Sequence, residues 1–162
     1  MRSESEIAPC LWFDSEAEQA VAFYTRIFKN SRIVTTSYYG EAGREIHRRP
    51  PGTVMAIGFE LEGQSFTALN GGPLFKFNEA VSPQVTCASQ EEIDYYWNAL
   101  CEGGDPSAQR CGWLKDRFGL SWQVVPDALP QIMSDPDAAK AGRAMVVLMK
   151  MTKIDLEALR NA

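Results

Sequence analysis

The chain repeats itself twice, with two different offsets. Residues 9–28 read PCLWFDSEAEQAVAFYTRIF, and the segment that begins 74 positions later, at Pro83, reads PQVTCASQEEIDYYWNALCE. A second similarity, with an offset of 56, relates Gly63-Gln-Ser-Phe to Gly119-Leu-Ser-Trp. Internal repetition constrains a fold strongly, because each copy is expected to form the same supersecondary unit. We therefore expect a domain with two related halves, and a site built on positions that the repeat pairs.

The first half reads as one strand, one helix and three further strands. Ser15 and Glu18 have the spacing of a capping box, which predicts that a helix begins at Ser15. The helix is amphipathic, because its apolar residues recur at helical spacing up to Phe28. The expected strands are 7–13, 32–39, 54–61 and 64–69, with a Gly/Pro/Arg loop over 40–53. Glu62-Gly63 joins the last two strands as a tight hairpin.

The second half repeats this order in shortened form. Ser89 and Glu92 form another capping box before a helix whose apolar residues follow the i, i+3, i+4, i+7 spacing. The expected strands are 84–88, 112–115 and 120–125. We assign residues 1–126 to two paired βαβββ modules, at about 7–71 and 83–126. Residues 127–162 read as a helical C-terminal extension of the same domain, either on the outer face of the sheet or against a second subunit.

The repeated order of strands and helix predicts an α+β fold, while composition agrees with one soluble domain and excludes several classes of function. With 162 residues, 45% of them hydrophobic, the chain can bury a sizeable core as a single unit. A net charge of −5 argues against a nucleic-acid-binding surface. No apolar run approaches the length of a membrane span, and the first ten residues are too polar for a secretory signal. We therefore expect a cytoplasmic protein without nucleic-acid or membrane partners.

Several short motifs have ordinary structural explanations. The four cysteines form no CxxC pair, and in a reducing compartment they are expected to be free thiols: Cys10, Cys87, Cys101 and Cys111. Cys101 and Cys111 could pair under oxidation. Asn70-Gly71-Gly72-Pro73 lacks the Lys-Ser/Thr ending of a phosphate-binding loop and reads as a turn. The basic cluster Arg44, His47, Arg48 and Arg49 either contacts an anionic ligand or is a solvated loop.

Three segments carry a resemblance to a known family. They are PCLWFDSEAEQAVAFYTRIF, FTALNGGPLFKFNEAVSPQV and CGWLKDRFGLSWQVVP. Together with the repeated βαβββ order, they resemble the PhnB-like branch of the vicinal oxygen chelate superfamily, whose members often carry the label 3-demethylubiquinone-9 3-methyltransferase. The superfamily includes glyoxalases, extradiol dioxygenases and fosfomycin or bleomycin resistance proteins. The resemblance implies two βαβββ modules in a curved mixed sheet, and commonly a homodimer, but a fold by itself does not establish an activity.

The resemblance also implies where a metal would bind. In the superfamily, a divalent cation is held by residues of the first and last strands of each repeat, typically His and Glu. The repeat maps these positions here to Cys10 with Gln84 and to Thr67 with Gln123, and a one-residue shift would substitute Leu11 for Cys10. Gln123 ends the segment Asp116-x-x-Gly119-x-x-x-Gln123, at the place where the superfamily motif has a metal-binding Glu. Amide and hydroxyl groups are weak ligands without compensating charge, so we expect no metal and no other cofactor.

The same positions predict a pocket for a small organic ligand. Its expected polar residues are Cys10, Thr67, Asn70, Gln84 and Gln123. Aromatic walls are expected from Trp12, Phe66, Trp122 and Phe75, although strand alternation prevents Trp122 and Gln123 from pointing the same way. The alternative is that the glutamines bond each other and side chains fill the cleft. An apolar pocket with a few polar groups suits a small, partly aromatic molecule.

Three functional hypotheses follow. The first is a small-molecule-binding protein that uses no metal, with Trp12 among its ligand-contacting residues. The second is a metal-dependent lyase, isomerase or dioxygenase that uses Cys10 with rearranged ligands, including His47 from the 40–53 loop. The third is a methyltransferase, as the family label suggests. The turn after the first strand, Asp14-Ser15-Glu16, has no glycine, so the sequence lacks the nucleotide-binding turn of doubly wound methyltransferases.

Overall fold

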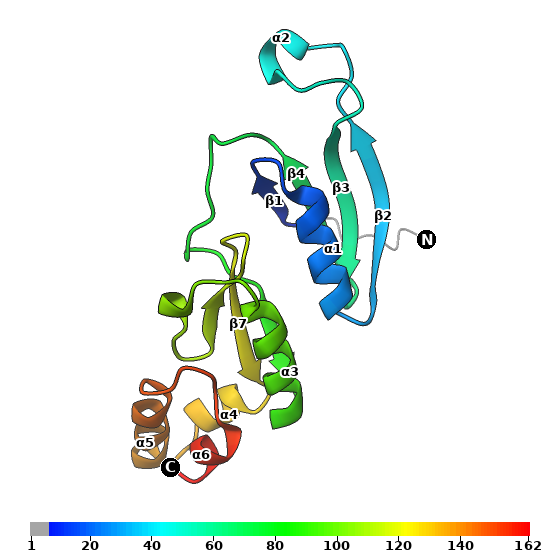
Figure 1. Ribbon diagram of the computed structural model, residues 1–162. Helices are drawn as coiled ribbons and strands as arrows, with labels where there is room; N and C mark the ends of the chain where they lie inside the picture. Colours follow the sequence, from blue (N-terminus) through cyan, green and yellow to red (C-terminus); the bar gives the residue numbers. More distant parts are fainter. Residues whose placement is uncertain (1–6) are drawn as a thin grey trace. The chain divides into compact units, whose positions relative to one another are not determined.

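The computed structural model describes residues 7–162 (Figure 1). The chain divides into two compact units, residues 1–76 and 77–162. Each unit has its own mixed sheet, sheet A in the first and sheet B in the second. The fold class predicted from the repeat, α+β with two related modules, is confirmed, with the strands in two small sheets.

The first unit is a complete βαβββ module. Its elements are β1 (Cys10–Phe13), α1 (Ala17–Ile27), β2 (Ser31–Tyr38), β3 (Val54–Leu61) and β4 (Gln64–Asn70), with a short helix α2 (Arg44–His47) in the loop before β3. The strand order in sheet A is β1-β4-β3-β2. β1 runs parallel to β4, and the other neighbours are antiparallel. The Glu62-Gly63 hairpin is confirmed, with positive φ at both residues, as its tight turn requires.

The core of this unit lies between α1 and one face of sheet A. The Tyr24 ring stacks on Phe59 of β3 with centroids 6.4 Å apart, and Phe59 stacks on Phe66 of β4 at 5.4 Å. All three side chains are buried. The face with Phe59 and Phe66 therefore faces α1, and we call the opposite face the open face of sheet A.

The second unit is the shortened copy that the sequence predicted. Its elements are β5 (Gln84–Cys87), α3 (Gln90–Cys101), a 3-10 turn η1 (Pro106–Ala108), β6 (Trp113–Lys115) and β7 (Ser121–Pro126), with sheet order β5-β7-β6. The segment around η1 stands in the place of β2. Ile93, Trp97 and Leu100 of α3 are buried, as their spacing predicted, and so are Leu114 and Val124 of the sheet. The other face of sheet B is its open face.

The two expected capping boxes have different outcomes. Ser89 caps α3, accepting a hydrogen bond from the Glu92 N–H at 3.2 Å, while the Glu92 carboxylate accepts one from the Ala88 N–H at 2.7 Å. The prediction for Ser15 was wrong, because α1 has Glu16 at its N-cap and no cap bond from its own turn. A side chain from β4 caps this helix instead.

The C-terminal segment forms three helices: α4 (Leu129–Met133), α5 (Ala138–Leu148) and α6 (Leu156–Arg160). Asp137 caps α5, because its side chain accepts hydrogen bonds from the Ala139 and Lys140 N–H groups. The Gln90 side chain of α3 bonds the Ile154 carbonyl and the Leu156 N–H, both within 3.0 Å. The segment is thereby fastened to α3 of the same unit. Among residues 7–162, no helix has the length and hydrophobicity needed to cross a membrane.

Candidate functional site

The residues that the repeat pairs lie on matching rungs of the two sheets. Cys10 of β1 lies opposite Thr67 of β4 in a parallel pair. Gln84 of β5 lies opposite Gln123 of β7, also in a parallel pair. The 74- and 56-residue offsets therefore correspond to equivalent positions in both units. Directly opposed residues of neighbouring strands share a face of the sheet, so each pair points one way.

In the first unit, this pair lies on the open face. Thr67 follows Phe66, which faces α1, so strand alternation turns Thr67 and its partner Cys10 away from the helix. Cys10 is exposed, and Trp12, two residues on, is half-buried. The indole N–H of Trp12 donates to the Gly72 carbonyl at 2.8 Å, and the Phe75 ring packs edge-on against it at 4.9 Å. Three of the predicted ligand-contacting residues, Cys10, Trp12 and Thr67, thus share one surface.

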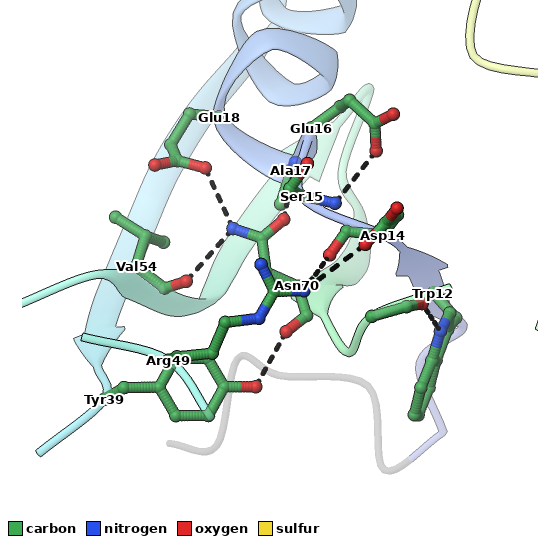
Figure 2. Close-up of polar contacts among 11 residues, drawn as sticks. Trp12, Asp14, Ser15, Glu16, Ala17, Glu18, Tyr39, Arg49, Val54 and Asn70 are labelled. Carbon is green, nitrogen blue, oxygen red and sulfur yellow. Dashed lines mark hydrogen bonds and ion pairs between the residues drawn. The ribbon is translucent and has the colours of Figure 1, made fainter. Parts of the chain in front are cut away.

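Asn70 does not join them. Its side chain is 1% exposed, and its Oδ1 accepts the Ala17 N–H at 2.9 Å, which caps α1. Its Nδ2 donates to Glu18 and to the Val54 carbonyl, at 2.9 and 3.0 Å (Figure 2). The bonds to Ala17 and Glu18 hold α1 to β4, and the bond to Val54 holds the start of β3 to β4. The position that the repeat pairs with Asn70 is Pro126, which offers no polar side chain, and this mismatch was the available sequence signal.

In the second unit, the two glutamines are bonded to each other. The Gln84 Nε2 donates to Gln123 Oε1 at 3.1 Å, and the Gln123 Nε2 donates to Ser82 Oγ at 2.8 Å. Trp113 of β6 is the antiparallel partner of Gln123 and shares its face. The sequence left open the alternative that the two glutamines bond each other, and this hydrogen bond is present in the structure. Gln84 is the first residue of this series of hydrogen bonds from Gln84 through Gln123 to Ser82, and it is exposed.

Two of the expected aromatic walls lie on the other side of their sheets. Phe66 is packed under α1, and Trp122 is 2% exposed. The Trp122 indole N–H donates to Asp116 Oδ2 at 2.9 Å, and Asp116 Oδ1 accepts the backbone N–H groups of Phe118 and Leu120. The acidic residue of the late motif therefore builds the β6–β7 turn. Trp12 and Trp113 are the tryptophans that remain on open faces.

The loop between β2 and β3 is fastened to the ends of β1 and β4. The Tyr39 hydroxyl donates to the Asn70 carbonyl at 2.7 Å, and the Arg49 guanidinium donates to the Asp14 carbonyl at 2.5 Å (Figure 2). The His47 ring lies 4.5 Å from the Tyr39 ring, and its Nδ1 accepts the Arg49 N–H. Arg49 of the basic cluster is thus engaged within the fold. This part of the cluster positions the loop.

The paired residues do not fit a divalent cation. One pair combines a thiol with a hydroxyl, and the other combines two amides, so neither supplies a carboxylate or an imidazole. Partial burial raises the pKa of the Cys10 thiol, which disfavours the thiolate that a metal requires. Within residues 7–162, no three His, Cys, Asp or Glu side chains gather in a group that could hold a metal ion. All four cysteines are free.

Sequence reasoning missed the residues that surround Gln123. Ser82, Trp113 and Lys115 all lie on or against the open face of sheet B, and Lys115 is bonded to Glu79. Trp113 and Lys115 flank Leu114, a buried residue, so alternation along a three-residue strand was the available signal. The strand was too short for this pattern to stand out.

Comparison with known proteins adds the family. The sequence profile of the 3-demethylubiquinone-9 3-methyltransferase family matches residues 5–125, three quarters of the chain. The chain belongs to this family. A comparison with curated proteins found no match. The family includes a solved relative, the PhnB protein from Bacillus cereus, which carries the same methyltransferase description. It is 36% identical, with a TM-score of 0.63, over 75% of this chain and 99% of that one.

More distant structures share the fold. Protein PA1353 from Pseudomonas aeruginosa is 20% identical, covers 76% of this chain and 100% of its own, and has a TM-score of 0.57. The fosfomycin resistance protein FosX from Listeria monocytogenes is 16% identical, covers 81% of this chain and 97% of its own, and has a TM-score of 0.55. The predicted membership of the PhnB-like family labelled 3-demethylubiquinone-9 3-methyltransferase is confirmed by the sequence profile and by the Bacillus cereus relative, and the fosfomycin resistance protein shows the same fold. The methyltransferase description is a family name and establishes no activity.

Proposed function

We propose that this family member is a cytoplasmic protein that binds a small organic molecule on the open face of a sheet, at the residues that the repeat pairs, without a metal. The observation that carries the proposal is the pair of matching rungs, Cys10 with Thr67 and Gln84 with Gln123. These groups can donate and accept hydrogen bonds, but they supply no charge to replace the water shell of a cation. Trp12 and Trp113 add flat apolar surface beside them.

The competing proposal is a metal-dependent enzyme. One structure of FosX, 14% identical to this chain, holds Mn(II) and a sulfate ion. The same fold can therefore carry a metal, and only the residue types at the paired positions separate the two proposals. A methyltransferase reaction draws no support from the β1–α1 turn, which has no glycine to approach a nucleotide.

The first test is metal content. We expect no stoichiometric Mn, Fe, Ni or Zn in tag-free protein by elemental mass spectrometry, and no change in melting temperature when these ions are added. A matched variant, Gln84→His with Gln123→Glu, supplies an imidazole and a carboxylate on one rung and is expected to gain stabilisation by Ni²⁺ or Mn²⁺. Near-stoichiometric metal in the natural protein, lost in Cys10→Ser, would instead establish the metal-dependent alternative.

The second test is ligand binding. Phenol and benzamide serve as small aromatic probes, observed by saturation-transfer NMR. Binding is expected to weaken about tenfold in Gln123→Ala, because a buried ligand group would lose its hydrogen-bond partner. Asn98→Ala, at an exposed position of α3, is the control and should bind as the natural protein does. Equal binding in Gln84→Ala, Gln123→Ala and the control would remove the glutamines from the site.

We further propose that the protein is a homodimer. β2 is an edge strand of sheet A, and seven of its eight residues are exposed. Ile33, Val34 and Tyr38 expose 56, 42 and 58% of their surface there. A long edge strand with large apolar side chains is a surface on which another strand can pair, and a second copy of this chain always presents the same edge.

A further inference from the structure

Residues 79–82 lie across the open face of sheet B and are fastened to it by two side-chain contacts. The Ser82 hydroxyl accepts a hydrogen bond from Gln123 Nε2 at 2.8 Å. Three residues earlier, the Glu79 carboxylate accepts a bond from the Lys115 Nζ at 2.5 Å. We call residues 79–82 the strap. The strap is therefore hydrogen-bonded to Gln123, a polar residue of the proposed site, and also to the cationic side chain of Lys115.

Lys115 stands among the groups that the proposed function uses. It lies two residues from Trp113 on β6, and both flank the buried Leu114, so both point to the open face. Along a strand, residues two apart on one face are separated by about 7 Å. Trp113 in turn lies directly opposite Gln123. A cation, an aromatic ring and an amide thus follow each other on one surface of sheet B, within the span of a small aromatic acid.

The ion pair is unevenly exposed. The Lys115 side chain is 26% exposed, while the Glu79 side chain is 65% exposed. The lysine is therefore held by the sheet, and its partner approaches from solvent on a connecting segment. The pKa of Glu79 is lowered, mainly by the hydrogen bond from Lys115, which shows that this position favours a carboxylate. The pKa of Asp105 is lowered mainly by its hydrogen bonds from Ser107, and the Lys115 charge makes a smaller contribution.

We propose that the open face of sheet B recognises a small organic carboxylate with an aromatic part, whose carboxylate takes the place of Glu79 on Lys115. Glu79 is then an internal stand-in for the ligand, and the strap moves aside when the ligand binds. The aromatic part would lie against Trp113, and Gln123 would exchange its bond with Ser82 for one with the ligand. This inference rests on the proposed function, since it names the ligand class for the same face.

Exposed ion pairs are weak, so displacement of Glu79 by a ligand carboxylate is energetically accessible. The ligand gains the lysine contact and adds the burial of an aromatic ring, which the strap does not supply. A competing internal group lowers the apparent affinity in proportion to the fraction of time it occupies the site. Removing the carboxylate of Glu79 should therefore tighten binding of an acid, whereas removing the lysine charge should abolish the preference for acids.

The experiment measures matched pairs of probes that differ only in charge: benzoate with benzamide, and phenylacetate with phenylacetamide. Dissociation constants are determined by NMR titration at low ionic strength with the full-length chain. We expect each acid to bind more tightly than its amide. In Glu79→Gln the acids should bind about threefold more tightly, with the amides unchanged, and in Lys115→Met the acids should weaken about tenfold.

A matched control exists in the same unit. Asp94 of α3 and Lys153 of the segment before α6 form an ion pair at 2.6 Å, in which both side chains are partly exposed. Lys153→Met changes the net charge as Lys115→Met does, so it should leave acid binding unchanged if the effect is local. Melting temperatures establish whether each variant is folded. If Lys115→Met is not folded, Lys115→Gln replaces it, and the inference is then tested by Lys115→Gln together with Glu79→Gln.

Two outcomes would overturn the inference. One is that no acid binds more tightly than its amide in the natural protein or in Glu79→Gln. The other is that Lys153→Met weakens acid binding as much as Lys115→Met does, which would indicate a general effect of charge. Either result leaves the proposed function standing if the amides still bind and Gln123→Ala weakens them. Loss of that Gln123 dependence would contradict the proposed function itself.

Discussion

At the scale of single residues, Asn70 shows how a predicted ligand group can be a structural one. Its amide was expected in the pocket as one of five polar groups. In the structure its Oδ1 accepts one hydrogen bond and its Nδ2 donates two, and these bonds hold α1 and β3, with 1% of the residue exposed. A helix cap supplied from a distant strand leaves no local sequence pattern, in contrast to the Ser89 cap of α3.

Asn70→Ala is expected to destabilise the protein by about 2 kcal/mol, because it leaves the Ala17 N–H without its buried acceptor. Urea denaturation followed by circular dichroism measures the loss. Asn98→Ala, exposed on α3, should change stability by less than about 0.5 kcal/mol. Similar small effects at both positions would show that the cap contributes little.

The cysteines predict how stability depends on alkaline pH. Burial, with added repulsion from Glu92 and Asp127, raises the pKa of Cys87 from 9.0 to about 11, and burial raises the pKa of Cys101 to about 11 as well. The unfolded chain therefore ionises these thiols first. Their contribution to stability is complete below pH 9 and is lost as the pH rises through 11.

We accordingly expect the melting temperature to fall between pH 9 and 11, and to fall less steeply in Cys87→Ala with Cys101→Ala than in the natural protein. Differential scanning fluorimetry from pH 7 to 11 measures both curves. Cys111→Ala serves as the control, because it removes another free thiol of the same unit. Parallel curves for all three proteins would contradict the assignment of the effect to Cys87 and Cys101.

At the scale of elements, two glycines differ in what they contribute: Gly71 allows close packing, and Gly142 weakens a helix. A Cβ at Gly71 would lie 2.4 Å from the Trp12 ring, so the turn after β4 can approach the indole only without a side chain. Gly142 lies inside α5, with nothing within 4 Å of its Cβ position. Packing against Trp12 therefore requires glycine at position 71. At position 142 glycine lowers helix stability, and no close contact requires it there.

Gly71→Ala is expected to displace the Trp12 indole from the Gly72 carbonyl, which lowers stability and alters the near-ultraviolet circular dichroism. Gly142→Ala should instead raise stability by about 0.5–1 kcal/mol, because alanine loses less backbone entropy in a helix. Chemical denaturation of both variants measures the opposite signs. An unchanged tryptophan signal in Gly71→Ala would mean that the turn can relax around the added methyl group.

At the scale of the whole molecule, the repeat is the organising feature. Each unit builds one sheet covered by one helix, and each places its repeat-paired residues on the open face. The units differ at their outer strands: sheet A ends in β2, with its exposed apolar residues, while sheet B has no counterpart of that strand in the described part of the chain. The edge proposed for dimerisation is thus a property of the first unit.

Light scattering coupled to gel filtration should give a mass of about 36 kDa for the natural protein, twice the 18.0 kDa of one chain. Val34→Lys places a charge on the β2 edge and is expected to give monomers. Ile46→Lys, at an apolar residue of α2 that is 82% exposed, is the control and should remain dimeric. A dimeric Val34→Lys variant would place the interface elsewhere, and a monomeric natural protein would refute the dimer.

The sequence by itself determined the family, the two related modules and most elements, because these depend on periodic apolar residues and local turn chemistry. The β3–β4 hairpin and the spacing of Ile93, Trp97 and Leu100 on α3 are examples. The repeat offsets also matched Cys10 with Gln84 and Thr67 with Gln123 as equivalent positions, whereas the strand register of the structure showed that Cys10 lies opposite Thr67 and Gln84 opposite Gln123.

Only the tertiary structure decided which polar groups are already used. Asn70 caps a helix 53 residues away in the sequence, Asp116 holds the Trp122 indole, and Glu79 reaches Lys115 across 36 residues. Hydrogen bonds and ion pairs depend on distances of a few ångströms between segments that the chain brings together on folding. The type of a residue determines which hydrogen bonds and ion pairs its side chain can form. Its neighbours in the folded structure determine whether those bonds are already made within the protein.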